Sequence, residues 1–280
     1  MSLFITSLNS GSNGNCYYVG NEKEAVLIDA GISCRETERR LLRLELSIKK
    51  IKGIFITHEH SDHIYGVSRL SRRHEIPVYI TPTTMARGRI HLKDHLMKAF
   101  RPYQTISIGD LVITGFPKLH DAVDPHSFMV SCRGINVGVF TDIGRSCKHV
   151  AKHFEQCHAA FLESNYDVEM LDKGSYPIAL KNRIRDGRGH LSNMEALHLF
   201  VNHRPAFMTH LLLSHLSENN NKPQIVEELF NRMAGRTEII IASRDNETPV
   251  YSITSEDLQR IRLTPKPVAA PSQMQLPLFQ

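Results

Sequence analysis

His58-Glu59-His60-Ser61-Asp62-His63 places three imidazoles and a carboxylate within six residues. The stretch follows the run 53–57 (Gly-Ile-Phe-Ile-Thr), whose β-branched and aromatic residues predict a buried strand. The first two histidines are two residues apart, so in an extended segment both rings point to the same side. The aspartate and the third histidine then fall in the first turn of a predicted helix and can face the same point. A solvated polar turn is the alternative, but donors of this kind at this density favour zinc, manganese or iron.

This pattern resembles the signature of the metallo-β-lactamase superfamily, His-x-His-x-Asp-His after a strand. Four further segments resemble the family's other motifs in the same order: 26–31 (Val-Leu-Ile-Asp-Ala-Gly), 118–121 (Lys-Leu-His-Asp), 139–144 (Val-Phe-Thr-Asp-Ile-Gly) and 211–215 (Leu-Leu-Leu-Ser-His). The resemblance implies an α/β fold, the αββα sandwich, in which two mixed sheets lie between helical layers. A chain of 280 residues, 41% of them hydrophobic, is long enough to bury the core of one such domain.

The resemblance also implies two divalent metal ions, zinc or manganese, with iron as a further candidate. The implied ligands of one ion are His58, His60 and His120. Those of the other ion are Asp62, His63 and His215, with Asp142 between the two ions. Asp62 is expected to take part in catalysis as well. Two ions about 3.5–4 Å apart can hold both the attacking and the leaving oxygens of a displacement reaction.

Three of these assignments have alternatives. His126 lies six residues beyond His120 and competes with it as a ligand. The alternative for Asp142 is that it caps the turn before Gly144, but the predicted strand 135–141 that precedes it favours the ligand role. For Asp29, in the first of the motifs, the resemblance implies hydrogen bonds that support the metal loop, and the alternative is a simple turn residue.

Two His-x-Ser segments narrow the function, because the fold alone hosts many reactions. They are 189–193 (Gly-His-Leu-Ser-Asn) and 214–217 (Ser-His-Leu-Ser), and 161–165 (Phe-Leu-Glu-Ser-Asn) precedes both. This order is similar to that of the family's nucleases that process tRNA 3′ ends, which implies that His190, backed by Glu163, protonates the leaving oxygen or stabilises the transition state. The alternative is that His190 caps a helix that begins nearby.

A closer resemblance is to the bacterial YycJ/WalJ branch, on the segments 10–15 (Ser-Gly-Ser-Asn-Gly-Asn), 189–193 and 213–220. That branch implies a metal-dependent DNA exonuclease acting 5′ to 3′. The turn at 11–15 is suited to meet phosphate with backbone N–H groups, although turn-rich hairpins use the same residues. The substrate-binding residues expected from these segments are Asn13, Asn15, Ser192, Asn193 and Asn219.

Basic residues support a polyanionic substrate such as DNA. The formal net charge is +5, and Arg183, Arg185 and Arg188 directly precede His190. Such residues bind phosphate without reading sequence; an ordinary solvated face is the alternative.

Other functions of the fold remain as alternatives. The histidine at position 60 disfavours the flavo-diiron branch, which has an acidic residue there. The lack of a zinc-binding cysteine near 211–215 and of an export signal disfavours a β-lactamase. A small-molecule hydrolase (a cyclic-nucleotide or phosphonate-type phosphodiesterase, or a glyoxalase II-like thioesterase) stays open, as does a non-catalytic, metal-stabilised binding module.

The hydropathy and the cysteines indicate where the protein is located, and the composition indicates where its domain ends. The sequence has no apolar run of about 18 residues, so no membrane span is expected. Met1 leads directly into a predicted strand, and the five cysteines include no Cys-x-x-Cys pair, so a cytoplasmic protein with reduced thiols is expected. We expect a catalytic domain over 1–263 and a disordered, Pro-rich tail over 264–280.

The tail ends in 275–279 (Gln-Leu-Pro-Leu-Phe). This peptide resembles the Gln-Leu-x-Leu-Phe motif with which bacterial polymerases and repair proteins dock on the sliding clamp. The implied contacts are made by Gln275, Leu276, Leu278 and Phe279, and they imply a role in replication-coupled DNA repair such as mismatch correction.

The expected elements follow the hydrophobic pattern. Strands are predicted near 3–8, 15–20, 25–29, 52–56, 77–80, 111–117, 126–132, 135–141, 159–163, 209–213 and 238–241. Helices are predicted near 63–74, 83–97, 146–155 and 222–233. Two more are expected to begin at the Ser-x-x-Glu capping boxes 33–36 and 192–195.

Overall fold

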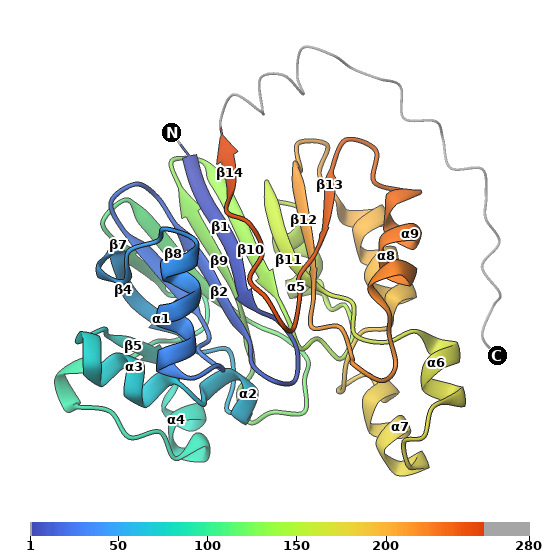
Figure 1. Ribbon diagram of the computed structural model, residues 1–280, viewed down its shortest axis with the longest axis horizontal. Coiled ribbons are helices and arrows are strands. Elements are labelled where there is room, and N and C mark those ends of the chain that lie inside the picture. Colours follow the sequence, from blue (N-terminus) through green and yellow to red (C-terminus); the bar gives the residue numbers. More distant parts are fainter. Residues whose placement is uncertain (1, 255–280) are drawn as a thin grey trace.

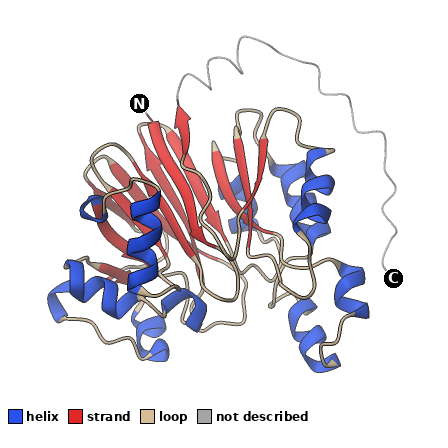
Figure 2. Ribbon diagram, viewed as in Figure 1, coloured by secondary structure: helices blue, strands red, loops and turns tan. Residues whose placement is uncertain are grey.

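Two seven-stranded sheets face each other at the centre of the molecule. The computed structural model describes residues 2–254. The first sheet has the order β14-β1-β2-β3-β4-β5-β6, with bounds Tyr251–Thr254, Ser2–Asn9, Cys16–Gly20, Ala25–Ile28, Ile51–Phe55, Val78–Ile80 and Met97–Ala99. The second has the order β13-β12-β11-β10-β9-β8-β7, with bounds Glu238–Ile241, His210–Ser214, Ala159–Glu163, Ile135–Phe140, His126–Cys132, Leu111–Pro117 and Thr105–Ile108. Helices flank the sheets on the outside (Figures 1 and 2), which confirms the αββα expectation.

Each sheet is antiparallel at one end and parallel at the other. In the first sheet β1, β2 and β3 are antiparallel, and β3 to β6 are parallel. In the second, β7 to β10 are antiparallel, and β10 to β13 are parallel. Parallel strands end at the same edge of a sheet, so the loops after β3, β4, β10, β11 and β12 gather where the site is built.

The helices on one side are α1 (Cys34–Arg43), α2 (Ser61–Ile64), α3 (Val67–His74) and α4 (Pro82–Gly88). The others are α5 (Lys148–Phe154), α6 (Val168–Lys173), α7 (Ile178–Arg185), α8 (Asn193–His203) and α9 (Pro223–Asn231). Short 3₁₀ turns occupy Ile48–Lys50 and Asp94–Leu96. Ser192 and Glu195 form the complete capping box predicted for α8. At α1, Ser33 caps Glu36 N, but the Glu36 carboxylate pairs with Arg39 and Arg40 instead of closing the box.

The core lies in three layers. Between the sheets, fully buried rings from both sides meet, including Phe55 from β4, Phe128 from β9 and Phe161 from β11. A second cluster packs β10 to β12 against α5, α8 and α9, and a third packs the first sheet against α1 and α3. Strands buried on both faces hold their ends in fixed positions, which is what a metal site requires.

The structure differs from the predicted elements in four places. Helices α6 and α7, of six and eight residues, were not predicted, because they are short. The helix predicted near 63–74 is divided at Gly66, where a Cβ would lie 2.0 Å from Ile32 O. The helix predicted over 83–97 ends at Gly88, and Arg89 caps it in the left-handed conformation (φ 50°). The following chain forms β6, which, with β7 and β14, was not predicted because these edge strands are short and expose much of their surface.

None of the helices within residues 2–254 is long and apolar enough to cross a membrane. The expected tail, 264–280, lies outside the described residues, as do Gln275, Leu276, Leu278 and Phe279.

Candidate metal centre

Three candidate site residues adopt the left-handed backbone conformation at strand ends. Asp29 follows β3 (φ 60°), Asp142 follows β10 (φ 52°) and His215 follows β12 (φ 56°). This conformation is uncommon for residues other than glycine and is found where a site over-determines the backbone. Each turn directs a side chain into the space between the sheet ends, where the histidine loop after β4 also lies.

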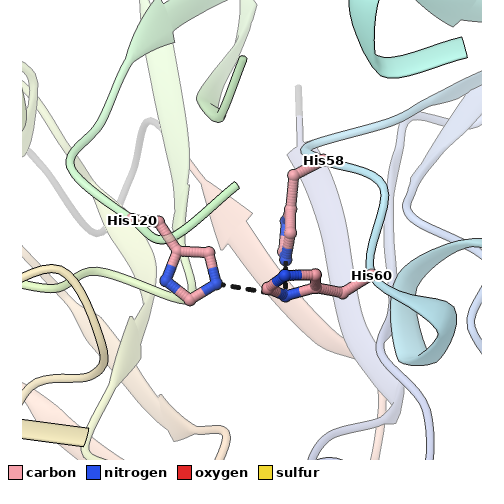
Figure 3. A group of neighbouring side chains, drawn as sticks. All are labelled: His58, His60 and His120. Carbon is pink, nitrogen blue, oxygen red and sulfur yellow. Dashed lines mark hydrogen bonds between the residues drawn. The ribbon is translucent and has the colours of Figure 1, made fainter. Parts of the chain in front are cut away.

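Three imidazoles converge at one side of this space (Figure 3). The distance from His58 Nε2 to His60 Nδ1 is 3.0 Å, and that from His120 Nε2 to His60 Nδ1 is 3.3 Å. Two nitrogens that each lie about 2.0–2.1 Å from a tetrahedral zinc ion are about 3.3 Å apart. The spacing of these donors therefore suits a shared cation.

A second group of donors lies beside the first. Asp62 Oδ2 is 3.5 Å from both His63 Nε2 and His215 Nε2. Asp142 lies between the groups: its Oδ2 is 3.0 Å from His63 Nε2, and its Oδ1 is 3.6 Å from His215 Nε2 and 3.8 Å from His120 Nε2. The structure thus brings together all seven predicted ligands in the two sets that the sequence implied.

The donors fit two divalent ions. Within residues 2–254, Asp142 Oδ2 and His215 Nε2 are buried without a hydrogen-bond partner. Buried polar atoms are normally satisfied, and atoms that are not satisfied within the protein mark the place of an ion or water. The set of imidazole nitrogens and carboxylate oxygens is compatible with zinc, manganese or iron.

His126, the competitor of His120, lies elsewhere. Its backbone N–H donates to Thr57 O, and its Nδ1 donates to Asp124 O. Among residues 2–254 it belongs to none of the clusters suited to a metal ion.

Asp29 supports the histidine loop after β4 through hydrogen bonds to Thr57 and His63. Its Oδ1 accepts from Thr57 N at 2.8 Å, and its Oδ2 accepts from Thr57 Oγ1 and His63 Nδ1, both at 2.7 Å. Donation through Nδ1 leaves His63 Nε2 free for the ion side, as is usual for metal-ligating histidines. This is the supporting role that the resemblance implied.

Asn15 has a supporting position that sequence reasoning did not foresee. Its Nδ2 donates to Asp62 Oδ2 at 3.2 Å, while its Oδ1 accepts from Gly11 N and Tyr17 Oη. It is fully buried, so its side chain orients a ligand rather than facing phosphate. Asn13, by contrast, is exposed on the same turn and donates to Arg244 O.

Glu163 and His190 form the predicted pair. Glu163 Oε1 accepts from His190 Nδ1 at 2.7 Å, and its Oε2 accepts from Ile143 N and Leu191 N. Oε1 also accepts from His215 Nδ1 at 3.2 Å. One fully buried carboxylate therefore orients both the candidate acid and a candidate ligand. The alternative role of His190 does not apply, since Ser192 caps α8.

Asn165, two residues beyond Glu163, is a further supporting residue that sequence reasoning missed. Its Nδ2 donates to His215 O at 2.8 Å and lies 3.2 Å from His215 Nδ1. Its place two residues after Glu163, in the same segment, was the available signal.

Two histidines of the site have pKa values shifted in opposite directions. Burial alone would lower the pKa of His63, but the carboxylates of Asp142, Asp29 and Asp62 outweigh it and raise that pKa to about 10. For His120, burial prevails and lowers the pKa to about 3. Neutral imidazole is the form that binds metal, so His120 is ready to bind, whereas a cation must displace a proton from His63.

The carboxylates of the site are ionised. Burial opposes ionisation of Glu163, but the neighbouring His190 and His215 lower its pKa to about 2. In the same way His215 and His63 hold the pKa of Asp142 well below its usual range.

The remaining expected substrate-binding residues divide into two groups. Ser192 and Asn193 are buried and engaged within the fold, in the capping box and in hydrogen bonds to Ser164 and Asn221. They therefore hold the His190 loop rather than offer their side chains to a substrate. The exposed group consists of Asn219, Arg183, Arg185 and Arg188.

Two of the exposed arginines are paired with carboxylates. Arg183 Nε lies 2.5 Å from Asp121 Oδ2, and Arg185 lies 2.7 Å from Asp172 Oδ1. Within the described residues the Arg188 guanidinium has no ion pair, so of these three arginines it is the one whose charge is not already neutralised by a carboxylate.

Comparison with known proteins agrees with this geometry. Residues 10–141 match the family model of the metallo-beta-lactamase superfamily. The chain is 33% identical over 233 residues to the exodeoxyribonuclease YycJ of Bacillus anthracis, covering 80% of this chain and 86% of that protein. It is also 33% identical to the exodeoxyribonuclease WalJ of Streptococcus pneumoniae, covering 81% and 87%. The solved structure of YhfI from Bacillus subtilis has the same fold, with a TM-score of 0.69, 16% identity and coverage of 90% and 100%.

Proposed function

This chain belongs to the metallo-β-lactamase superfamily, in the branch of the YycJ and WalJ exodeoxyribonucleases, and from that premise we propose that it is a cytoplasmic, dinuclear DNA exonuclease acting 5′ to 3′. The observation that carries the proposal is the Glu163–His190 pair, which lies 3.7 Å (His190 Nδ1 to Asp142 Oδ1) from the central carboxylate of the metal centre. A side-chain acid at this place, next to the ions, can protonate the leaving oxygen when a phosphodiester is cut.

The ligands proposed are His58, His60 and His120 for one ion, and Asp62, His63 and His215 for the other, with Asp142 between them. Two bound ions supply positive charge for the phosphate oxygens and lower the pKa of the attacking water. Asp62, held by Asn15, lies at the entrance to this centre with a side chain 19% exposed.

His190 is proposed to give the proton to the leaving 3′-oxygen. Its Nδ1 donates to Glu163, which leaves Nε2 for the substrate. Glu163 is ionised, so it stabilises the positive imidazolium that such an acid requires. The same carboxylate holds the backbone of Leu191, so the acid cannot move away from the centre.

Substrate comparison tests the proposed function. The protein loaded with zinc or manganese should degrade duplex and single-stranded DNA faster than matched RNA, bis(p-nitrophenyl) phosphate, cyclic nucleotides or thioesters. Rates are read from end-labelled products under one set of conditions. Turnover of a cyclic nucleotide or thioester without cleavage of DNA would overturn it.

A small-molecule phosphodiesterase is the second candidate, and one observation favours it. The pocket beside His190 has a volume of about 210 Å³, less than the roughly 300–1,000 Å³ of sites for drug-sized ligands. Such a pocket can take one nucleotide unit, either free or at the end of a strand. The substrate comparison separates these two cases.

Phosphate contact outside the centre is proposed for Arg188. Arg188→Gln should weaken DNA binding and reduce the slope of log Kd against log salt by about 0.7–0.9, the value of one lost phosphate contact. Arg185→Gln is the matched control, because Arg185 is already paired with Asp172 and its loss should change the slope less. Equal effects of the two substitutions would mean that Arg188 makes no special contact with the DNA phosphates.

Clamp binding is proposed for the last residues, which lie outside the described part of the chain. A labelled 271–280 peptide should bind the organism's own sliding clamp with a Kd on the order of micromolar, the range of short disordered peptides. Leu278→Ala with Phe279→Ala removes two apolar anchors and should abolish binding. Equal binding of both peptides would remove the argument for replication-coupled repair and leave the nuclease proposal intact.

A further inference from the structure

The pocket beside His190 has an apolar wall that does not belong to the sandwich. Tyr176, Leu180 and Ile184 line it from the α6–α7 segment, and Leu216 lines it from the loop after β12. The first three side chains belong to a small separate cluster with Tyr166 and Leu171. Figure 1 shows α6 and α7 away from the helices that cover the sheets. The segment therefore builds a surface that the main core does not need.

The charges of the pocket cancel. Asp121 and Arg183 both line it, and they are paired with each other at 2.5 Å. The other polar lining residues away from the histidines, Ser12, Asn165 and Ser217, are neutral. An apolar and neutral surface suits an uncharged, planar group better than a phosphate.

Tyr176 offers a ring in a fixed position at this surface. Its hydroxyl accepts a hydrogen bond from Asn219 Nδ2 at 3.1 Å. Asn219 lies on the loop after β12, so this bond joins the two sides of the pocket. A half-buried tyrosine that is held in this way can stack with a nucleobase without a large loss of side-chain freedom.

The wall is joined rigidly to the catalytic residues. His190 N donates to Ile184 O at 2.9 Å, and His120 Nδ1 donates to Gly189 O at 2.9 Å. Whatever the pocket holds is therefore positioned relative to both the acid and a metal ligand.

The pocket lies on the leaving-group side of the reaction. In 5′-to-3′ digestion, water adds to phosphorus, the bond from phosphorus to the 3′-oxygen of the terminal nucleotide breaks, and that oxygen takes a proton. The phosphate stays on the shortened strand. Because His190 would give that proton and also lines the pocket, the departing nucleotide must lie beside it.

We infer that this pocket holds the base of the 5′-terminal nucleotide, stacked on Tyr176 and packed against Leu180, Ile184 and Leu216. The inference rests on the proposed nuclease function. It gives the enzyme a binding site for one unpaired terminal base, selected by stacking rather than by sequence.

The test compares DNA that has an ordinary 5′-terminal nucleotide with DNA whose terminal nucleotide lacks the base. For the wild-type protein, removal of the base should lower kcat/KM of the first cleavage by roughly 5- to 150-fold, the value of one base–aromatic stack. Tyr176→Ala should cause a similar loss on ordinary DNA and little further loss on the abasic substrate. Tyr176→Phe keeps the ring and should retain most of the discrimination.

Tyr103→Ala is the matched control, since Tyr103 is 48% exposed and bonded to His149, away from this pocket. It should discriminate between the substrates as the wild-type protein does. An equal loss on both substrates in Tyr176→Ala would mean that the tyrosine is merely structural, and no loss on either would mean that the base does not touch it. Both results would overturn the inference while DNA cleavage, and so the proposed function, stands. Absence of DNA cleavage by the wild-type protein would overturn both.

Discussion

Replacing Asp142 by asparagine should lower kcat/KM by more than roughly 100-fold and reduce the bound metal below two ions per chain. Asp142 is the carboxylate whose two oxygens face both groups of donors, and in the described part of the chain Oδ2 has no hydrogen-bond partner. Loss of residues that only support ligands already costs about 10–100-fold. The loss of a shared ligand should cost more.

Asparagine is the informative substitution at this position. Asp142 has φ 52°, a conformation that asparagine tolerates and alanine does not, so Asp142→Ala would add backbone strain to the loss of the ligand. Metal content is measured by mass spectrometry of dialysed protein, with Asp110→Asn, an exposed carboxylate paired with Arg133, as the control. Full activity of metal-depleted Asp142→Asn would rule out the dinuclear centre.

His190→Ala should lose about 10²–10⁴-fold in kcat, the usual contribution of a general acid, while its metal content stays that of the wild type. The imidazole contacts Glu163 and lies outside both groups of three proposed ligands. Its ring nitrogen also lies within 4.8 Å of donor atoms of Asp142, Glu163 and His215, so the metal content of the variant is the decisive measurement.

His215→Ala is the matched comparison, because His215 shares the Glu163 carboxylate but belongs to the second group of donors. It should lose metal as well as activity. If His190→Ala loses as much metal as His215→Ala, His190 is a ligand and the role proposed for it is wrong.

The fold and the members of the site were predicted from the resemblance to the family motifs, and each motif is a short, local signal. Each candidate ligand follows a strand of apolar residues, and the strand end determines where the side chain lies. His58 and His60 needed only alternation along an extended chain to be placed on the same side. The edge strands β6, β7 and β14 lack such apolar runs and were missed.

The supporting residues could not be assigned in this way. Asn15 and Asn165 contact ligands that are 47 and 50 residues away in the sequence, so their roles depend on tertiary structure. Ser192 and Asn193 were expected at the substrate because their segment resembles the YycJ/WalJ branch. In the structure Ser192 caps α8 and Asn193 bonds to Ser164 and Asn221, roles that serine and asparagine also suit.

The ion pair of Arg183 could not be predicted from the sequence either. Its position before His190 suggested a phosphate contact, yet its guanidinium pairs with Asp121, which directly follows His120. A basic run in a sequence does not reveal which of its members are already neutralised by a partner from another segment.

Digestion of one duplex labelled in turn at its 5′ and 3′ ends tests the central claim most directly. With metal-loaded protein, the 5′ label should appear at once in a mononucleotide, while the 3′-labelled strand should shorten stepwise into a ladder. Asp142→Asn should give neither product. Immediate release of the 3′ label, internal fragments from both labels, or undiminished digestion after metal removal would contradict a metal-dependent 5′-to-3′ exonuclease.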